Sequence, residues 1–341
     1  MDPPAAFVGI AKMSAGGANE GKGQWNVEEL ENICGWSLSL ETVREAVQSV
    51  PQSAVGESPF LHYACANKRV SLEIVECILN AFPGAAGVGT DEFCPEGDKE
   101  AYPLHLACSH HHCPNSVIEL LVEKNLSALY HFCVVDDGID GVYDCVEGLP
   151  LHYYLKRESN IDLATVKMLV DAYPDALSTA DDDTGMTPLR TLLRNPHAGG
   201  LHDIFQFLIE YNPDSILLTD TDGGTSLHHA CTNGNLALNT VEMILVACPD
   251  AIVQRDNDGY LPIHSLCNVE TLDDASALDT LNLLLNRNHH LVFETTGSGD
   301  LPIHLAARSH YPKICKILVD AYPESVRIAT SRGMLPIHEA C

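Results

Sequence analysis

The chain has 341 residues, of which 45% are hydrophobic and 19% charged, with 47 Asp and Glu residues against 19 Lys and Arg residues. The formal net charge of −28 repels phosphate backbones, which argues against nucleic-acid binding. The sequence contains no apolar run of the ~18 residues that would predict a membrane span, and its N-terminus lacks the pattern of a secretory signal. The acidity leaves three interpretations open: a basic protein partner, bound cations, or solubility alone.

The N-terminal part divides into a tail and a first helical unit. Residues 1–24 are rich in Gly, Ala and Pro without periodicity, which predicts a flexible tail. The pattern over residues 25–57 predicts a degenerate capping unit with one helix over 25–33 and a second over 38–50. The second helix ends at Pro51, because proline cannot continue a helix.

A Pro-apolar-His phrase recurs through residues 58–341. It is clearest over 301–307, which read Leu-Pro-Ile-His-Leu-Ala-Ala. The aligned residue recurs every 34 to 47 residues, at His62, His105, His152, Arg190, His228, His264, His304 and His338. A recurrence at this period is typical of a stacked repeat array.

Each unit of the array predicts two antiparallel helices and a turn. The proline starts a short helix, where its missing N–H costs nothing, and a longer apolar helix follows, as over 239–245. The longer helix ends near a proline such as Pro249, and an extended pair such as Ala251-Ile252 comes next. A polar Asp/Gly turn leads back to the next phrase. One unit cannot bury its apolar faces alone, so neighbouring units must stack.

These units resemble ankyrin repeats, whose signature reads Asp-x-x-Gly-x-Thr-Pro-Leu-His. Residues 220–228 match it except at Ser226, and residues 182–190 match it except at Arg190. The resemblance implies an all-α solenoid of stacked helix pairs with projecting β-turns and hairpins, with about eight repeats and the last one incomplete. It also implies that the repeat histidine is buried and hydrogen-bonded to neighbouring turn backbone, and that partners bind the turn tips and the inner helix face.

Three departures from the family pattern carry expectations. Leucine replaces the Thr that would cap the first helix in some copies, a predicted loss of about 0.5–2 kcal/mol per site, at Leu149, Leu261, Leu301 and Leu335. Proline replaces the usual glycine after the second helix, so the turn there should differ in geometry. The sequence stops at Cys341, so the final unit lacks a second helix. Truncation, or an incomplete gene model, is the favoured interpretation over a chain that continues naturally.

Two units carry long acidic insertions in the turn, over 86–102 and 129–148. The second insertion predicts a hairpin, with strands over 132–135 and 142–143 around an Asp/Gly-rich turn.

No pattern for catalysis or cofactor binding is visible, since the sequence has neither a nucleophile–base arrangement nor a glycine-rich phosphate loop after a strand. The best metal candidate is the segment 108–113, which reads Cys-Ser-His-His-His-Cys and offers ligand types that zinc accepts. Tetrahedral closure by adjacent residues is awkward, so a solvated polar loop is favoured over a metal site. Asp182 occupies the turn-forming slot of the repeat. The sequence therefore predicts no enzyme, no cofactor and no metal site.

The cysteines predict reduced thiols. They recur three residues after the aligned position, at Cys65, Cys108, Cys231, Cys267 and Cys341. Ala or Leu holds the same slot in other copies, which indicates a packing position. Free thiols in this number favour a cytoplasmic chain, or a nuclear one.

The remaining interpretation is a protein–protein interaction scaffold that binds a partner, with a basic surface, through acidic turn tips and the concave helix face. The alternative is the targeting module of a larger protein whose catalytic, adaptor or channel domain lies beyond Cys341. Acidic turns that serve only solubility also remain open. The candidate partner-binding residues are Asp136, Asp137, Asp140, Asp144, Asp181, Asp183, Met186, Asp222, Arg255, Asn257, Asp258, Tyr260, Asp300 and Met334.

Overall fold

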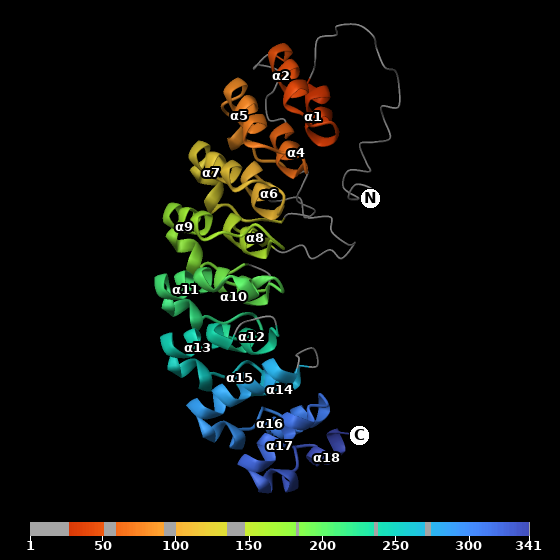
Figure 1. Ribbon diagram of the computed structural model, residues 1–341, viewed down its shortest axis with the longest axis vertical. Coiled ribbons are helices and arrows are strands. Elements are labelled where there is room, and N and C mark those ends of the chain that lie inside the picture. Colours follow the sequence, from red (N-terminus) through yellow and green to blue (C-terminus); the bar gives the residue numbers. More distant parts are fainter. Residues whose placement is uncertain are drawn as a thin grey trace. The chain divides into compact units, whose positions relative to one another are not determined.

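The computed structural model describes residues 27–50, 59–91, 100–134, 147–181, 184–234, 238–269 and 274–340. Within these ranges the protein is all-α, with paired α-helices, short 3-10 helices and one ladder of two-residue strands (Figure 1). Its contacts divide the chain into two compact units. Unit 1 comprises Met1–Ala176 with Asp181–Asp183, and unit 2 comprises Leu177–Ala180 with Thr184–Cys341.

Unit 1 is built from helix pairs in two layers. The pairs are α1 (Val27–Trp36) with α2 (Leu40–Ser49), α4 (Phe60–Ala66) with α5 (Leu72–Ala81), α6 (Pro103–Ser109) with α7 (Asn115–Lys124), and α8 (Pro150–Lys156) with α9 (Leu163–Ala172). The first helices contact one another in succession and the second helices do the same. The 3-10 helices are η2 (Ala85–Gly87), η3 (Leu126–Tyr130) and η4 (Pro174–Ser178), the last of which spans the sequence boundary between the units.

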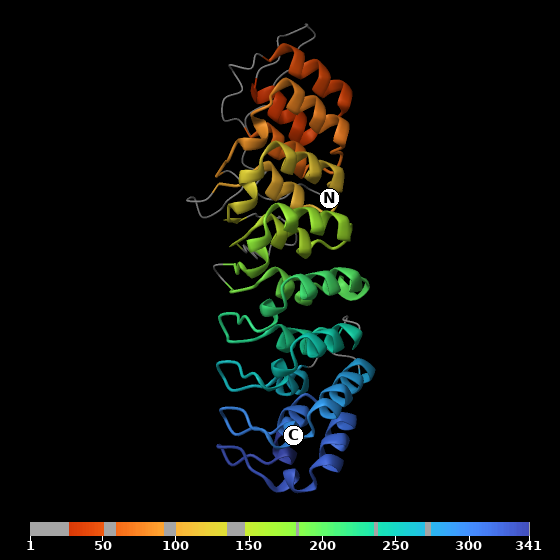
Figure 2. The ribbon, with the colours of Figure 1, turned by 90° about the vertical axis from the view of Figure 1, so that its left-hand side faces the viewer.

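Unit 2 repeats this plan, as Figure 2 shows in side view. Its first helices are α10 (Pro188–Arg194), α12 (Ser226–Thr232), α14 (Pro262–Asn268), α16 (Pro302–Arg308) and α18 (Pro336–Glu339). Its second helices are α11 (His202–Tyr211), α13 (Leu238–Ala247), α15 (Asp274–Arg287) and α17 (Pro312–Ala321). Its 3-10 helices are η5 (Ala198–Gly200), η6 (Pro213–Ile216), η7 (Pro249–Val253), η8 (His289–Phe293) and η9 (Pro323–Arg327).

Tertiary packing stabilises the short first helices. Helix α6 has 7 residues, too few to be stable alone in water. Every residue from Pro103 to Cys108 is buried, and Pro103 occupies the first helical turn as predicted. The second helices bury one stripe only, which in α7 consists of Val117, Ile118, Leu121 and Val122. The first helices therefore form the core and the second helices cover it.

The segments after the second helices differ from the prediction. Ala251 and Ile252 were expected to be extended, but they lie inside η7. Pro249 fixes a helical φ at the start of this segment, and the Ala251 N–H donates to the carbonyl of Cys248 at 3.2 Å. Other predicted extended pairs lie in η6 and η9 in the same way. A 3-10 helix also follows the second helix where proline is absent, in η3 and η8, so proline fits this segment without being required for it.

The turn insertions of unit 1 each close with a short antiparallel pairing. Strand β1 (Cys133–Val134) pairs with β2 (Glu147–Gly148), Cys133 opposite Gly148. The predicted second strand, 142–143, lies outside the described residues, and the strand that pairs comes later in the chain. In the first insertion, Thr90 and Ala101 exchange backbone hydrogen bonds of 3.0 and 2.8 Å.

The described helices are short. The longest of them, α15, has 14 residues. Among the helices of the described ranges, none has the length and apolar character needed to cross a bilayer.

Candidate protein-interaction surface

The turns that connect the helix pairs of unit 2 are shaped by one side chain each. Asp256 Oδ1 accepts the N–H groups of Asp258 at 3.0 Å and Tyr260 at 2.7 Å. Asp220 accepts the amides two and four residues further on in the same way, at 3.0 and 2.6 Å. In the next turn the hydroxyl of Thr296 accepts the amide four residues on, at 3.1 Å. Short polar side chains that bind their own backbone are what these turns require.

Glycine is required in these turns for two reasons. Gly223 and Gly259 have φ values of +80° and +78°, a region that other residues rarely adopt. A Cβ on Gly259 would also lie 2.7 Å from the backbone nitrogen of Gly297, in the following turn. On Gly223 it would lie 2.6 Å from the side chain of Asn257. Close contact between neighbouring turns therefore depends on glycine.

Backbone hydrogen bonds join each turn to the one before it. The N–H of Asn257 donates to the carbonyl of Asp222 at 2.9 Å, and the N–H of Gly297 donates to the carbonyl of Asp258 at 2.9 Å. The same bond joins Thr221 to Thr184 at 3.2 Å and Ser331 to Ser298 at 3.1 Å. Figure 2 shows these turns projecting to the same side of unit 2. We call the turns 220–224, 256–260, 296–300 and 330–334 the turn strip.

The candidate residues differ in exposure. Asp222, Arg255, Asn257 and Asp258 are exposed, and Tyr260 and Met334 are half-buried. The expectation of an exposed side chain is wrong for Asp181, Met186 and Asp300, which are 3%, 6% and 2% exposed. The remaining candidates lie outside the described residues: Asp136, Asp137, Asp140, Asp144 and Asp183.

Asp300 is buried because it is bonded within its own turn and to a helix. Its amide donates to the Thr296 hydroxyl, and its carboxylate lies 3.4 Å from the guanidinium of Arg308. Arg308 also pairs with Glu339 at 2.8 Å. The arrangement of Asp300 and Glu339 around Arg308 was not predicted, because the three residues come from separate segments.

Arg255 is exposed, but its charge is matched locally. Its guanidinium pairs with Glu294 at 2.5 Å and donates to the carbonyls of Gly259 and Thr295, both at 2.7 Å. It therefore joins two adjacent turns. The negative charge of Asp222 and Asp258 consequently dominates this part of the turn strip.

His229 and Asp220 form a second pair that was not predicted, with 2.6 Å between Nε2 and Oδ2. Burial disfavours the charged carboxylate, but the hydrogen bonds from His229 and from the Gly224 amide outweigh burial and lower the pKa of Asp220. The signal available in the sequence was the second histidine of the phrase Leu-His-His over 227–229. This pair fixes the base of a turn to helix α12.

The repeat histidines link each first helix to the following segment. His105 Nδ1 accepts the N–H of Tyr102 at 3.1 Å, and its Nε2 lies 2.9 Å from the carbonyl of His131. His264 bonds in the same way, at 3.0 Å on each side. Burial lowers the pKa of both to about 4. A neutral ring with its proton on Nε2 makes both bonds, with Nδ1 as acceptor and Nε2 as donor. These side chains therefore have a structural role.

The same histidines bind the backbone N–H at the start of the first helix in copies with leucine and with threonine alike. The N–H groups of Leu261 and Leu301 each donate to the Nδ1 of the repeat histidine at 3.0 Å. Thr225 makes this bond at 3.1 Å, and its hydroxyl contacts the ring of His228 without capping a helix amide. The copies with leucine therefore keep the bond between this N–H and the histidine ring, and the predicted cost of losing the threonine hydroxyl stays a prediction.

Arg190 replaces the repeat histidine in helix α10 and is fully buried. Its guanidinium donates to the carbonyls of Leu218 and Gly185. Leu218 belongs to the segment that follows the second helix, where a histidine would also direct its Nε2. Arginine thus keeps the link between segments with a longer side chain.

Two side chains of the histidine cluster between α6 and α7 bind backbone carbonyls. His110 Nδ1 lies 2.9 Å from the carbonyl of Leu106, and His112 Nε2 lies 3.2 Å from the carbonyl of Ala66. Burial, followed by the neighbouring His110, lowers the pKa of His112 to about 4. A group of three or more side chains placed to hold a metal ion is not found among the described residues.

The cysteine side chains of the repeat phrase are buried. Cys65, Cys108, Cys231 and Cys267 are at most 2% exposed, and the cysteines of the described ranges are free thiols. Burial raises the pKa of Cys108 and Cys231 to about 12, which keeps them protonated and unreactive.

Comparison with protein-family models finds no match for the chain, and comparison with curated proteins finds none either.

Proposed function

We propose that this protein is an ankyrin-type α-solenoid that acts as a non-catalytic interaction scaffold. It binds a partner protein that has a basic surface, through the turn strip and the adjacent inner face of the first helices. The observation that carries the proposal is the ladder of backbone hydrogen bonds that holds successive turn tips in register. The histidine links and the glycine turns support the resemblance to ankyrin repeats. The buried free thiols support a cytoplasmic or nuclear location.

The charge of the turn strip defines the partner. Asp222 and Asp258 are exposed, and the nearby Arg255 is paired with Glu294. The other two turns add no exposed carboxylate, since Asp300 is buried, and Arg332 of the last turn is exposed. The acidic part of the turn strip, on a chain of net charge −28, attracts a basic surface and speeds its association. Salt weakens this effect, because exposed charges are screened within about 8–10 Å at physiological ionic strength.

The test uses a photo-crosslinking amino acid placed at Asn257, which is exposed on the turn strip. The control position is Gln206, which is exposed on helix α11. We expect light to join position 257 to a protein with a basic surface in cell extracts, and we expect position 206 to give no such product. Asp222→Lys with Asp258→Lys, or added salt, should reduce the product at least ~5-fold. Equal crosslinking from both positions, or a product that charge reversal leaves unchanged, would contradict the proposal.

A further inference from the structure

A second surface lies on the 3-10 helices that follow the second helices of unit 2. In three of these segments the fifth residue, counted from the opening Pro or His, is a large apolar side chain: Leu217, which directly follows η6, Val253 of η7 and Phe293 of η8. These side chains are 40%, 49% and 46% exposed. We call them the apolar row. The residue before each, by contrast, is at most 7% exposed, in Ile216, Ile252 and Val292. In η9 the fifth residue is Arg327.

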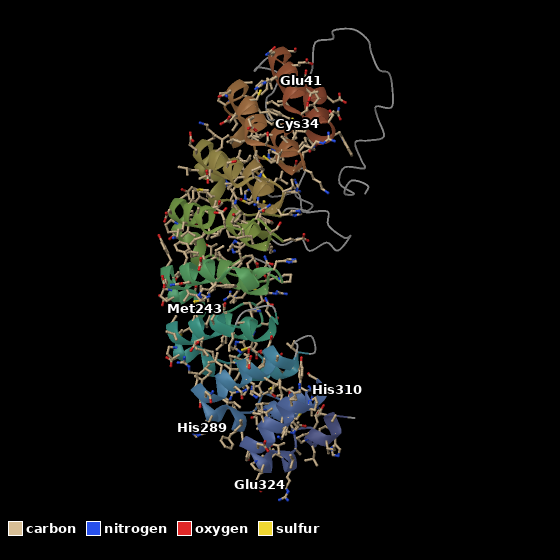
Figure 3. The ribbon with its side chains drawn as sticks, in the orientation of Figure 1. Cys34, Glu41, Met243, His289, His310 and Glu324 are labelled. Atoms are coloured by element: carbon tan, nitrogen blue, oxygen red, sulfur yellow. The ribbon has the colours of Figure 1, made fainter. Side chains whose placement is uncertain are left out.

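The members of the apolar row share one side of unit 2. Helices α11, α13 and α15 contact one another in succession, so the segments η6, η7 and η8 that end them also follow one another (Figure 1). Figure 3 labels His289 of η8 and His310 of the α16–α17 loop on opposite sides of unit 2. Segment η8, which ends in Phe293, therefore lies away from that loop, on the side where helix α15 ends.

One member of the apolar row is fixed by an aromatic contact. The ring of Phe293 packs edge-on against Tyr322, which directly follows helix α17, with 4.6 Å between ring centroids. Tyr130, at the equivalent position in unit 1, packs on Tyr173 at 4.7 Å in the same geometry. An aromatic side chain that is fixed on one edge and half-exposed loses little conformational entropy on binding. Such side chains are typical anchors of protein interfaces.

Two members of the apolar row, Leu217 and Val253, have a carboxylate in their own segment, whereas the corresponding residue beside Phe293 is His290. The second residue of η6 and of η7 is aspartate, Asp214 and Asp250, and that of η9 is Glu324; all three are exposed. Neither Asp214 nor Asp250 forms an ion pair with another described residue, whereas Glu324 pairs with Arg327 at 3.5 Å. An acidic residue suits the start of a helical turn. That accounts for the carboxylates, but it does not account for the exposed apolar side chains beside them.

We propose that the apolar row is a docking surface for a basic amphipathic segment of a partner protein. Apolar side chains of the segment would pack on Leu217, Val253 and Phe293, and its Lys or Arg side chains would pair with Asp214 and Asp250. Charge complementarity selects this occupant. A second copy of this chain, with net charge −28, would bring further negative charge to these carboxylates. Single exposed apolar residues are ordinary, but a repeated apolar row with two exposed carboxylates that form no described ion pair is typical of a binding site.

The test measures binding of a fluorescein-labelled 18-residue peptide with Leu at i, i+3, i+4 and i+7 and Lys elsewhere, by fluorescence anisotropy in 150 mM salt. The row variant L217S/V253S/F293S keeps every charge, and we expect it to bind at least ~10-fold more weakly than the native chain. The matched control L126S/L238S/I337S removes three exposed apolar side chains elsewhere and should bind as the native chain does. Melting curves by circular dichroism verify that each variant is folded.

Two further arms keep the proposal open to refutation. Asp214→Lys with Asp250→Lys should also weaken binding at least ~10-fold, and a peptide with Ser in place of Leu should bind at least ~10-fold more weakly. Equal binding by the row variant or by the Ser peptide would overturn the proposal, since attraction would then be electrostatic alone. A native dimer that the row variant converts to a monomer, seen by sedimentation, would also overturn it, because a second copy would then occupy the row.

Discussion

Units 1 and 2 join their neighbouring helix pairs by different means. In unit 1, side chains carry much of the connection. Arg157 follows helix α8, is 2% exposed, and donates from Nε to the carbonyl of Cys108 at 2.8 Å. Its Nη2 also donates to the carbonyls of Ala107 and Cys113. These carbonyls belong to the end of α6 and the turn after it, so one guanidinium bridges two helix pairs.

Asparagines make smaller links of the same kind. Asn67, after α4, donates to the carbonyls of Cys34 and Gly35 at 3.0 and 2.8 Å. Asn233, after α12 in unit 2, donates to the carbonyl of Leu193 at 2.6 Å. In each case the terminal carbonyls of one first helix are satisfied by the side chain that ends the next.

Unit 2 adds the backbone ladder of the turn strip to these links. Its turns keep a matching length, so the amide of one turn lies opposite the carbonyl of the last. Unit 1 contains both long insertions, over 86–102 and 129–148. We infer that side chains carry more of the connection where turns differ in length, and that backbone carries more where turns are uniform. The histidine link is common to both units.

Acid should have the largest effect and should act on both units alike. Burial lowers the pKa of His62, His105 and His264 to about 4, so the native state keeps these rings neutral. The unfolded chain binds the protons near pH 6.5. Stability is therefore fully present above pH 6.5 and is lost as the pH falls toward 4, on the order of 1 kcal/mol per histidine per pH unit.

The measurement is urea unfolding at intervals from pH 7.5 to 4.5. The variant His105→Gln is the control, because it removes one titrating ring and should make the fall in stability with acid shallower. Hydrogen exchange resolves the two units, and protection should fall in both. Loss of protection in one unit alone, or an unchanged slope in the variant, would show that the histidines are not the common link.

Substitution of Arg157 by Met should come next in size and should act on unit 1 first. It leaves the carbonyls of Ala107, Cys108 and Cys113 buried without their donor, at a cost of about 3–5 kcal/mol. Arg194→Met is the control, because Arg194 is exposed at the end of helix α10 and should cost under ~0.5 kcal/mol. Equal unfolding midpoints for the two variants would mean that side chains do not carry the connection in unit 1.

Much of the helical framework could be predicted from the sequence. The Pro-His phrase places a helix start at Pro103, Pro150 and Pro302, because proline suits only the first turn. The apolar spacing of the second helices indicates which stripe is buried. These signals are local, since each depends on residues within one or two turns of helix.

The remaining features depend on contacts between segments that a single sequence does not reveal. The buried role of Arg157 depends on carbonyls about 50 residues earlier in the chain. Met186 and Asp300 occupy turn positions that favour exposure, but their side chains are buried. The apolar row was missed because Leu217 and Val253 follow buried apolar residues, and the sequence does not separate a buried member from an exposed one.

The smallest expected effect isolates the backbone ladder of unit 2. Gly259 and Gly333 both have φ of +78°, but a Cβ on Gly259 would meet the next turn, whereas nothing lies within 4 Å of one on Gly333. Gly333→Ala should therefore cost only the left-handed backbone term, about 1–2 kcal/mol. Gly259→Ala should cost about 1 kcal/mol more, because it also displaces the bond between the carbonyl of Asp258 and the N–H of Gly297. Hydrogen exchange at the Gly297 amide measures that bond directly. If both variants unfold at the same urea concentration and leave this amide equally protected, the turns of unit 2 are stacked without being joined, and the contrast with unit 1 disappears.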